Sequence, residues 1–396
     1  MIFKEKIKKI FHDKGYPLYD FMRRNGFIEQ TNLNLNLCDL SQKRVLICYV
    51  PIPNYDFSEI IHAQSAHINQ IIYNFTKRGF CVNVCYANDI QSYRRICHYH
   101  YDIVFGFGSA YKQACMDNPA ALKISFIMEN HPDVVSQKYS DRIRYFKSRH
   151  PHIDISSSIV RSGFFDADQF KLSDIGILMS SRYNSLNFSE LRNKILLINC
   201  NSIFNKKYEF VPEEVIKSIS SSRRNFLWFG SVGLIHKGLD IVIDAFKELP
   251  DICLNVYGLD KKEYGLFEKL KADNTYNKKR INVLSDEFIT DVVKKHNFMI
   301  LDSCSEGMST SVSTCMAHGI IPIVSKECGF DEASCIIQLE DNSVEGVKAA
   351  IQKACDMSDE EVLNMRRDCY EYARNQFSLE HFDRVFYEEL GKILNM

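Results

Sequence analysis

The chain has 396 residues, the length of two or three ordinary domains, so a disulfide-stapled miniprotein is excluded. Apolar residues make up 45% and charged residues 25%, and glycine and proline are too scarce for a disordered or fibrous protein. With 49 Lys and Arg against 50 Asp and Glu, the formal net charge is −1, so no overall basic field attracts nucleic acid. Composition predicts a soluble globular protein without a nucleic-acid partner.

Residues 1–42 read as an amphipathic helix followed by a connector. One face of a predicted helix over residues 2–11 is apolar, and lysines occupy the rest; the apolar side chains are Phe3, Ile7, Ile10 and Phe11. Such a helix could rest on anionic lipid as a peripheral contact at the inner face of the membrane, or pack on its own domain. The Asn-rich run 31–37 then leads into the main body.

Nothing in the chain indicates secretion or a membrane span. The residues after Met1 mix charge into every turn instead of forming an apolar signal core. No apolar run approaches the roughly 20 residues that cross a bilayer. The 14 cysteines contain no Cys-x-x-Cys pair. These features predict a cytoplasmic protein with reduced cysteines.

From residue 43, short apolar runs alternate with helical patterns, which predicts a parallel sheet covered on both faces. A helix is expected over 67–78, and strands are expected at 45–50, 80–86, 103–107, 123–128, 175–179 and 195–198. This series predicts a Rossmann-like, doubly wound α/β domain over residues 43–205.

A second series of the same kind predicts a second Rossmann-like domain over residues 206–375. Its strands are expected at 226–229, 252–257, 281–284, 298–301 and 320–324, and its helices at 240–249, 261–272 and 311–318. The final segment, 376–396, contains an amphipathic helix over 377–394. Ligands of open parallel sheets bind beyond the carboxyl ends of the strands, so two facing domains predict a central cleft.

The loop after strand 226–229 begins at Gly230 and Ser231 and runs to Lys237 and Gly238. Its glycines let backbone amides approach a ligand, and Lys237 brings a positive charge suited to phosphate. Glycine and lysine in a strand-to-helix turn are more often turn chemistry alone. The loop by itself leaves both interpretations open.

The loop after strand 298–301 leads into the helix predicted over 311–318. Amides of Met308, Ser309 and Thr310 lie where free N–H groups and the helix dipole favour an anion. The alternative is a Ser/Thr N-cap with nothing bound. Glu306, just outside the strand end, is placed to accept hydrogen bonds from ligand hydroxyls, which would suit a sugar.

Residues 226–390 resemble the retaining glycosyltransferase family 4, whose GT-B fold has two Rossmann-like domains facing a cleft. The resemblance rests on residues 230–240, on Ser303-Cys-Ser-Glu306-Gly307 and on 317–324. It implies an enzyme that moves a sugar from a nucleotide-sugar to a glycan or lipid-linked acceptor with retention, with no cofactor and no bound metal. It also implies that the last helix crosses back to brace the first domain.

Carried over residue by residue, the resemblance places Gly230, Ser231 and Lys237 at the donor diphosphate, which the backbone from Gly307 through Met308 and Ser309 to Thr310 would also hold. Glu306 would contact the donor sugar. Two positions depart from the family: Thr314 replaces a glutamate that usually binds the ribose, and Ser231 replaces a common arginine.

His131 follows strand 123–128, where members of the family often carry a histidine near the acceptor and the reacting centre. Pro132 keeps this segment a loop, as a cleft residue requires. With Glu306 and Lys237 it completes the predicted catalytic set. The alternative is a loop histidine hydrogen-bonded to its neighbours.

Other interpretations remain open at this stage. Ser231 and Thr314 are compatible with a catalytically weak GT-B protein that acts as a scaffold in glycan assembly, and an epimerase or a phosphorylase is a third candidate. The groupings that could suggest a metal fit no standard pattern at their positions, so no metal site is predicted; they are Asp166-Ala-Asp168, Cys97-His98-Tyr-His100 and His150-Pro-His152.

Overall fold

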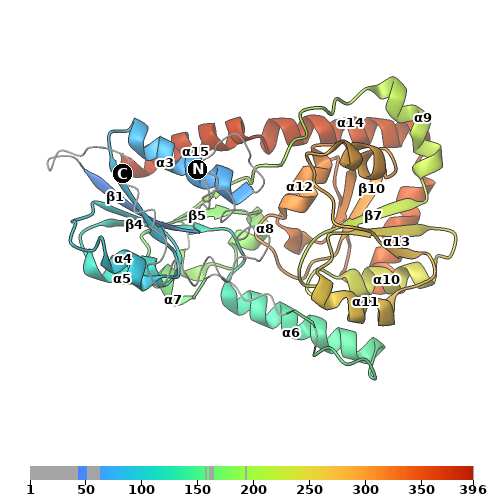
Figure 1. Ribbon diagram of the computed structural model, residues 1–396, viewed down its shortest axis with the longest axis horizontal. Coiled ribbons are helices and arrows are strands. Elements are labelled where there is room, and N and C mark those ends of the chain that lie inside the picture. Colours follow the sequence, from blue (N-terminus) through green and yellow to red (C-terminus); the bar gives the residue numbers. More distant parts are fainter. Residues whose placement is uncertain (1–42, 51–62, 157, 160–164, 192–193, 396) are drawn as a thin grey trace, which may run out of the picture.

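Two six-stranded parallel sheets form the framework of the chain in the computed structural model (Figure 1), which describes residues 43–50, 63–156, 158–159, 165–191 and 194–395. The first sheet has the order β2-β1-β3-β4-β5-β6. Its strands are β1 (Arg44–Tyr49), β2 (Cys81–Tyr86), β3 (Ile103–Gly106), β4 (Leu122–Ile127), β5 (Ile175–Met179) and β6 (Ile195–Ile198). β1 is buried along its whole length, because helices cover both faces of the sheet.

The second sheet has the order β12-β11-β10-β7-β8-β9. Its strands are β7 (Asn225–Phe229), β8 (Cys253–Tyr257), β9 (Thr275–Asn277), β10 (Phe298–Leu301), β11 (Ile321–Val324) and β12 (Ile337–Gln338). The first strand of each sheet, β1 or β7, lies inside the sheet, and the later strands are added on both sides of it, which is the doubly wound arrangement. The predicted fold class, two Rossmann-like α/β domains of the GT-B kind, is confirmed.

Helices connect the strands in both domains. Those of the first domain are α3 (Ala63–Lys77), α4 (Ile90–Arg94), α5 (Gly108–Asp117), α6 (Pro132–Arg149), α7 (Asp168–Leu172), α8 (Arg182–Ser185) and the 3-10 turn η1 (Ser189–Leu191). Those of the second are α9 (Pro212–Ser222), α10 (Leu239–Lys247), η2 (Lys261–Glu263), α11 (Tyr264–Leu270), the π-helix η3 (Phe288–Val293), α12 (Thr310–Met316), η4 (Lys326–Cys328), α13 (Val344–Asp356), α14 (Asp359–Gln376) and α15 (Leu379–Leu394).

One predicted strand is wrong. Residues 281–284 form a loop and a turn, and the strand that pairs with β8 is β9, which begins six residues earlier, at Thr275. Ile281 and Val283 still pack against the core, so their apolar character reflects loop packing and not a strand. The helix predicted over 261–272 is likewise divided, into the turn η2 and the shorter α11. The amphipathic segment 2–11 lies outside the described residues.

The last helix, α15, returns to the first domain and lies beside α3 (Figure 1). Asn74 of α3 donates to Asp383 over 2.6 Å, and Arg78 donates to the carbonyl of Tyr387 over 2.5 Å. The chain therefore joins its two domains twice, once through the linker after β6 and once through the junction of α14 and α15.

Cysteine pairing differs in one place from the expectation of reduced thiols. Twelve described cysteines are free, and Cys81 is disulfide-bonded.

None of the helices that the structure describes is long and apolar enough to cross a membrane.

The linker after β6 is anchored to the second domain through His318. The backbone N–H of Asn205 donates to Nε2 of His318 over 3.1 Å, and Nδ1 of the same ring donates to the carbonyl of Thr314 over 2.7 Å. Burial lowers the pKa of His318 to about 4, so the imidazole is neutral and can accept at Nε2.

A buried arginine connects the chain segments that precede β10 and β11 in the second domain. Arg366 of α14 is 1% exposed, and it donates to the carbonyl of Gly319, to Oδ1 of Asn297 and to the carbonyl of Val293. Two segments that are distant in sequence, the chain between η3 and β10 and the turn before β11, thus depend on one guanidinium, whose planar fork of donors suits several acceptors at once.

We expect Arg366→Leu to lower the free energy of unfolding by about 3 kcal/mol, because it leaves three buried acceptors without donors. Urea unfolding followed by circular dichroism measures this loss. The neighbouring Arg367→Leu is the control, because Arg367 donates only within its own helix, to exposed Asn364. Equal losses in the two variants would contradict the role given to Arg366.

We expect acid to weaken the linker anchor. The pKa of His318 is lower in the folded than in the unfolded chain, so its contribution is complete above about pH 6.5 and is lost as the pH falls toward 4. Between pH 7 and pH 4 the wild type should lose on the order of 3 kcal/mol more stability than His318→Gln. Thermal unfolding across this range tests the difference, with exposed His152→Gln as the control; identical pH profiles for wild type and His318→Gln would refute it.

Candidate active site

Two strand-end loops bring Lys237 and Glu306 together. Lys237 follows β7 and Glu306 follows β10, and because these strands are neighbours in a parallel sheet, their carboxyl-end loops meet. Nζ of Lys237 donates to Oε1 of Glu306, and Oγ of Ser303 donates to the same oxygen over 3.0 Å. The side chains of the pair are 7% and 5% exposed. The sequence predicted both residues as candidates, and the structure makes them a buried ion pair.

Backbone contacts hold the two loops in a fixed relation. The N–H of Cys304 donates to the carbonyl of His236 over 2.8 Å, and the His236 ring contacts the carbonyl of Ser305 over 2.6 Å. Gly238 has a φ of +66°, and a Cβ on it would lie 2.1 Å from the carbonyl oxygen of Asp302. Only glycine fits this approach, so the chain after Lys237 is pressed directly on the chain before Glu306.

The segment from Gly307 to Thr310 touches the first domain. A Cβ on Gly307 would lie 2.0 Å from the carbonyl oxygen of Met128, which follows β4. Oγ of Ser180 donates to the Gly307 carbonyl over 2.6 Å, and Nδ2 of Asn184 donates to the Glu306 carbonyl over 3.2 Å. The candidate site therefore lies where the two domains meet.

The predicted diphosphate cradle is partly engaged by the protein itself. Ser309 is the N-cap residue of α12, and its own N–H donates to the carbonyl of Cys328 over 3.1 Å. Met308 is buried and Thr310 is exposed. In this conformation the Ser309 amide is therefore unavailable to an anion, which corrects the expectation that all amides from 307 to 310 serve one.

The two positions that depart from the family lie apart. Ser231 is exposed beside half-buried Gly230, at the mouth of the β7 loop. Thr314 is 2% exposed, and its Oγ1 accepts the N–H of Ile203 over 3.2 Å. The position expected to face a ribose is thus in contact with the linker between the domains.

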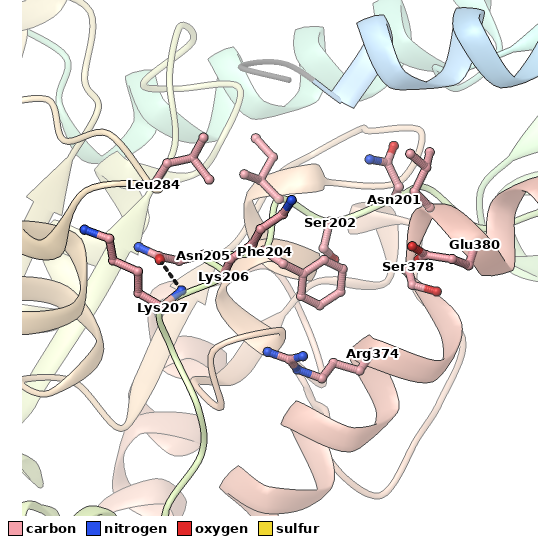
Figure 2. A pocket seen from close by; sticks show the side chains of 12 residues that line it. Asn201, Ser202, Phe204, Asn205, Lys206, Lys207, Leu284, Arg374, Ser378 and Glu380 are labelled. Atoms are coloured by element: carbon pink, nitrogen blue, oxygen red, sulfur yellow. Dashed lines mark hydrogen bonds between the residues drawn. The ribbon is translucent and has the colours of Figure 1, made fainter. Parts of the chain in front are cut away.

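Ile203 also lines a cavity of about 720 Å³. Figure 2 shows Leu284 and Lys207 on one side of it and Ser378 and Glu380 on the other. Its cationic side chains are Lys206, Lys207 and Arg374, and its aromatic ring is that of Phe204. Oδ1 of Asn201 and Oγ of Ser202 are buried in its wall without a hydrogen-bond partner. Sequence reasoning missed this cavity, because no motif marks it.

His131 is held by its own domain. It is the N-cap residue of α6, where its Nδ1 accepts the N–H of Asp133 over 3.3 Å. Its Nε2 lies 3.3 Å from Oε1 of Glu190, and its ring lies 5.5 Å from the rings of Phe170 and Phe188. These partners of His131 all belong to the first domain. Pro132 begins α6, so the expectation that it keeps this segment a loop is wrong: proline is compatible with the first turn of a helix, where its missing N–H leaves no hydrogen bond unmade. His131 caps this helix and contacts its neighbours in the first domain.

A chain of amides links the His131 turn to Glu306. Nδ2 of Asn130 donates to Oδ1 of Asn184 over 3.2 Å, and Asn184 in turn donates to the carbonyl of Glu306. These two side chains thus connect the His131 turn to the Glu306 backbone.

Sequence reasoning missed Arg142, Asp302 and Glu327. Arg142 of α6 donates to Oδ2 of Asp302 over 2.8 Å and to the carbonyl of the same residue over 2.9 Å. Complete burial raises the pKa of Asp302 to about 6, although Arg142 opposes the shift. The available signal was positional, because Asp302 directly follows β10.

Glu327 lies beside the Glu306 loop and accepts the Glu306 N–H at its backbone carbonyl over 3.0 Å. Its carboxylate accepts from Lys138 over 2.8 Å and from Asn342 over 3.2 Å. Burial alone would raise the pKa of Glu327, and the hydrogen bond and charge of Lys138 bring it below its usual value.

The groupings considered as metal ligands have other partners. Asp166 pairs with Lys112 over 2.5 Å, and Asp168 pairs with Lys171 over 2.8 Å. His150 lies 2.7 Å from a carboxylate oxygen of Asp244. Within the ranges that the structure describes, no three His, Cys, Asp or Glu side chains gather in a way that could hold a metal ion.

Known proteins match this chain by family and by fold. Residues 212–376 match the family of glycosyl transferases group 1. No curated protein matches the sequence significantly. HepE of Anabaena, solved with UDP and glucose, is similar at a TM-score of 0.57 and 10% identity, covering 89% of this chain and 100% of its own. Sucrose-phosphate synthase of Thermosynechococcus elongatus is similar at a TM-score of 0.59 and 13% identity, covering 89% and 99%.

A third similar structure is a trehalose-6-phosphate synthase, analysed with bisubstrate glycomimetics for glycosyl transfer with retention. Its TM-score is 0.54 and its identity 9%, covering 89% of this chain and 99% of its own. At these identities the likeness concerns the fold, and the family match adds the activity. The chain is a glycosyltransferase with the GT-B fold, and its residues 212–376 are similar to the glycosyl transferases group 1.

Proposed function

We propose that the protein transfers a sugar from a UDP-sugar to a glycan or lipid-linked acceptor, with retention of the anomeric configuration. The observation that carries the proposal is the buried Lys237–Glu306 pair at the carboxyl ends of adjacent strands, inside the group 1 domain. UDP is favoured because HepE, which has a similar fold, is solved with UDP and glucose. Retention is favoured by the similar trehalose-6-phosphate synthase.

The donor diphosphate would take the place that the Glu306 carboxylate occupies on Lys237. Without donor, the ammonium and the carboxylate neutralise each other, which avoids two unpaired buried charges. With donor, Nζ of Lys237 would turn to the phosphate oxygens, and the freed carboxylate would accept hydrogen bonds from sugar hydroxyls. Amides of Gly307, Met308 and Thr310 would add donors to the diphosphate as its charge grows during bond cleavage.

The nucleoside would extend past Thr314 into the cavity. Thr314 lies between the predicted phosphate segment and Ile203, which lines the cavity. The Phe204 ring offers a face on which a base can stack. Asn201 and Ser202 offer an amide oxygen and a hydroxyl that still lack partners. Thr314 would give the ribose one neutral hydrogen bond, weaker than the charged pair of bonds from a glutamate.

Leaving-group charge would be met by Lys237 and backbone amides, so we propose transfer without a bound metal or a cofactor. Ser231 has a neutral side chain and therefore adds no second cation at its loop. His131 would act on the acceptor side by keeping the Asn130 turn against Asn184. The basic face predicted for residues 2–11 would supply peripheral contact with anionic lipid at the cytoplasmic face, where a lipid-linked acceptor would be found.

We expect one nucleotide among UDP, GDP, ADP and CMP to raise the melting temperature, and we expect it to be UDP, because a ligand that binds only the folded state stabilises it. Lys237→Ala should weaken the binding of this nucleotide at least about 10-fold, because a charged contact with the phosphate is lost. Lys247→Ala is the control, since Lys247 pairs with Asp244 near the surface. If no nucleotide stabilises the wild type at millimolar concentration, a scaffold role replaces the proposed reaction.

We expect Glu306→Gln to separate nucleotide binding from chemistry. UDP should bind as tightly as to the wild type or more tightly, because Lys237 no longer has a competing carboxylate. Turnover of UDP-glucose, the test donor, should fall about 100-fold if the carboxylate is needed as the sugar leaves. Glu268→Gln, which removes an exposed carboxylate paired with Lys271, serves as the control. Unchanged turnover in Glu306→Gln would remove Glu306 from the mechanism.

A further inference from the structure

One face of α6 binds the second domain along most of the helix. Figure 1 shows α6 leaving the first sheet and running beneath α10 and α11. The contacting residues recur at spacings of four, three and four, which places them on one face; they are Lys138, Arg142, Tyr145 and Arg149. Three of them are cations, and their partners are carboxylates of the second domain.

The partners of α6 fall into two groups. Arg149 donates to Asp240 and Asp244, which both belong to α10. Arg142 donates to Asp302, which belongs to the loop that carries Glu306. Both arginines therefore hold the domains together. Arg142 donates to the loop that carries Glu306, whereas Arg149 donates to helix α10.

Arg142 fixes Asp302 by side chain and main chain at once. One terminal nitrogen donates to the carboxylate and the other to the carbonyl oxygen, and the two side chains are 4% and 0% exposed. A guanidinium can do this because its donors are arranged in a planar fork, whereas lysine presents a single ammonium. The peptide unit after Asp302 is thereby held in one orientation.

The loop that carries Lys237 and the loop that carries Glu306 meet at that peptide unit. The Asp302 carbonyl is the group against which Gly238 packs, and Gly238 directly follows Lys237. The hydroxyl of the next residue, Ser303, donates to the Glu306 carboxylate over 3.0 Å, and its oxygen lies 3.3 Å from the His236 carbonyl. Displacing Asp302 therefore moves Lys237 and Glu306 together.

We propose that Arg142, supplied by the first domain, is a positioning residue for the donor site of the second domain. It sets the spacing of Lys237 and Glu306 through Asp302, so the donor site is complete only when α6 lies against the second domain. The inference rests on the proposed function, in that Lys237 and Glu306 are the groups that meet the donor.

The test compares two arginines on the same helix face. Arg142→Lys and Arg149→Lys each replace a guanidinium that bridges two acceptors, and each should lower the melting temperature. With UDP as the probe, only Arg142→Lys should raise the dissociation constant, by about 10-fold or more, and with UDP-glucose it should also raise KM. If the two variants change the dissociation constant of UDP equally, both arginines act only by holding the domains together, and the proposal is overturned.

Asp302→Asn and Asp244→Asn form the second matched pair, on the opposite side of the same interface, and serve if Arg142→Lys does not fold. Asp302→Asn should weaken UDP binding, whereas Asp244→Asn should leave it unchanged, and equal effects of the two would overturn the proposal. When Arg142→Lys folds, adding Asp302→Asn to it should weaken UDP binding little further, because both changes break one interaction. Additive losses in the double variant would overturn the proposal.

Lys237→Ala distinguishes the two levels of failure. If it abolishes UDP binding while Arg142→Lys and Asp302→Asn leave that binding unchanged, only the positioning role is wrong. If Lys237→Ala itself leaves UDP binding unchanged, or no UDP binds, the proposed function is wrong and the positioning role falls with it.

Discussion

The candidate site depends on opposite charges buried at the carboxyl ends of two adjacent parallel strands. Removing an ammonium and a carboxylate from water is costly, and the cost is recovered only when they meet with good geometry and further hydrogen bonds. Lys237 and Glu306 meet in this way, and Ser303 adds a bond to the same carboxylate oxygen. The two groups of such a pair suit a ligand that has an anion for the lysine and hydroxyls for the glutamate.

The same constraint explains how the domains are joined. Where a buried carboxylate of the second domain lacks a cation of its own, the first domain supplies one, as Arg142 does for Asp302 and Lys138 for Glu327. Glycine at position 307 lets the loop touch the Met128 carbonyl, since any Cβ would collide with it. The loops that carry Lys237 and Glu306 thus belong to one domain and are held by the other, which ties the geometry of the candidate site to the domain arrangement.

Prediction from sequence succeeded where a local pattern has a single structural outcome. Alternating apolar runs and helices produce parallel sheets, so the two doubly wound domains were predicted. Lys237 and Glu306, chosen because they follow strand ends, lie together in the structure. It failed where apolar residues serve a loop, as at Ile281 and Val283, because burial alone does not distinguish a strand from a packed turn. It also failed at α6, whose contacting face is cationic and so resembles a solvated surface.

By itself, the sequence determined the fold class and the residues Lys237 and Glu306, because periodicity and strand-end chemistry are local properties. Tertiary structure decided which groups meet. It paired Lys237 with Glu306, occupied the Ser309 amide, directed the His131 ring toward Glu190 and its own domain, and placed Arg142 on Asp302 across 160 positions of chain. Contacts at such separations depend on how the helices pack on both sheets and on how the two domains close on each other, which no local pattern records.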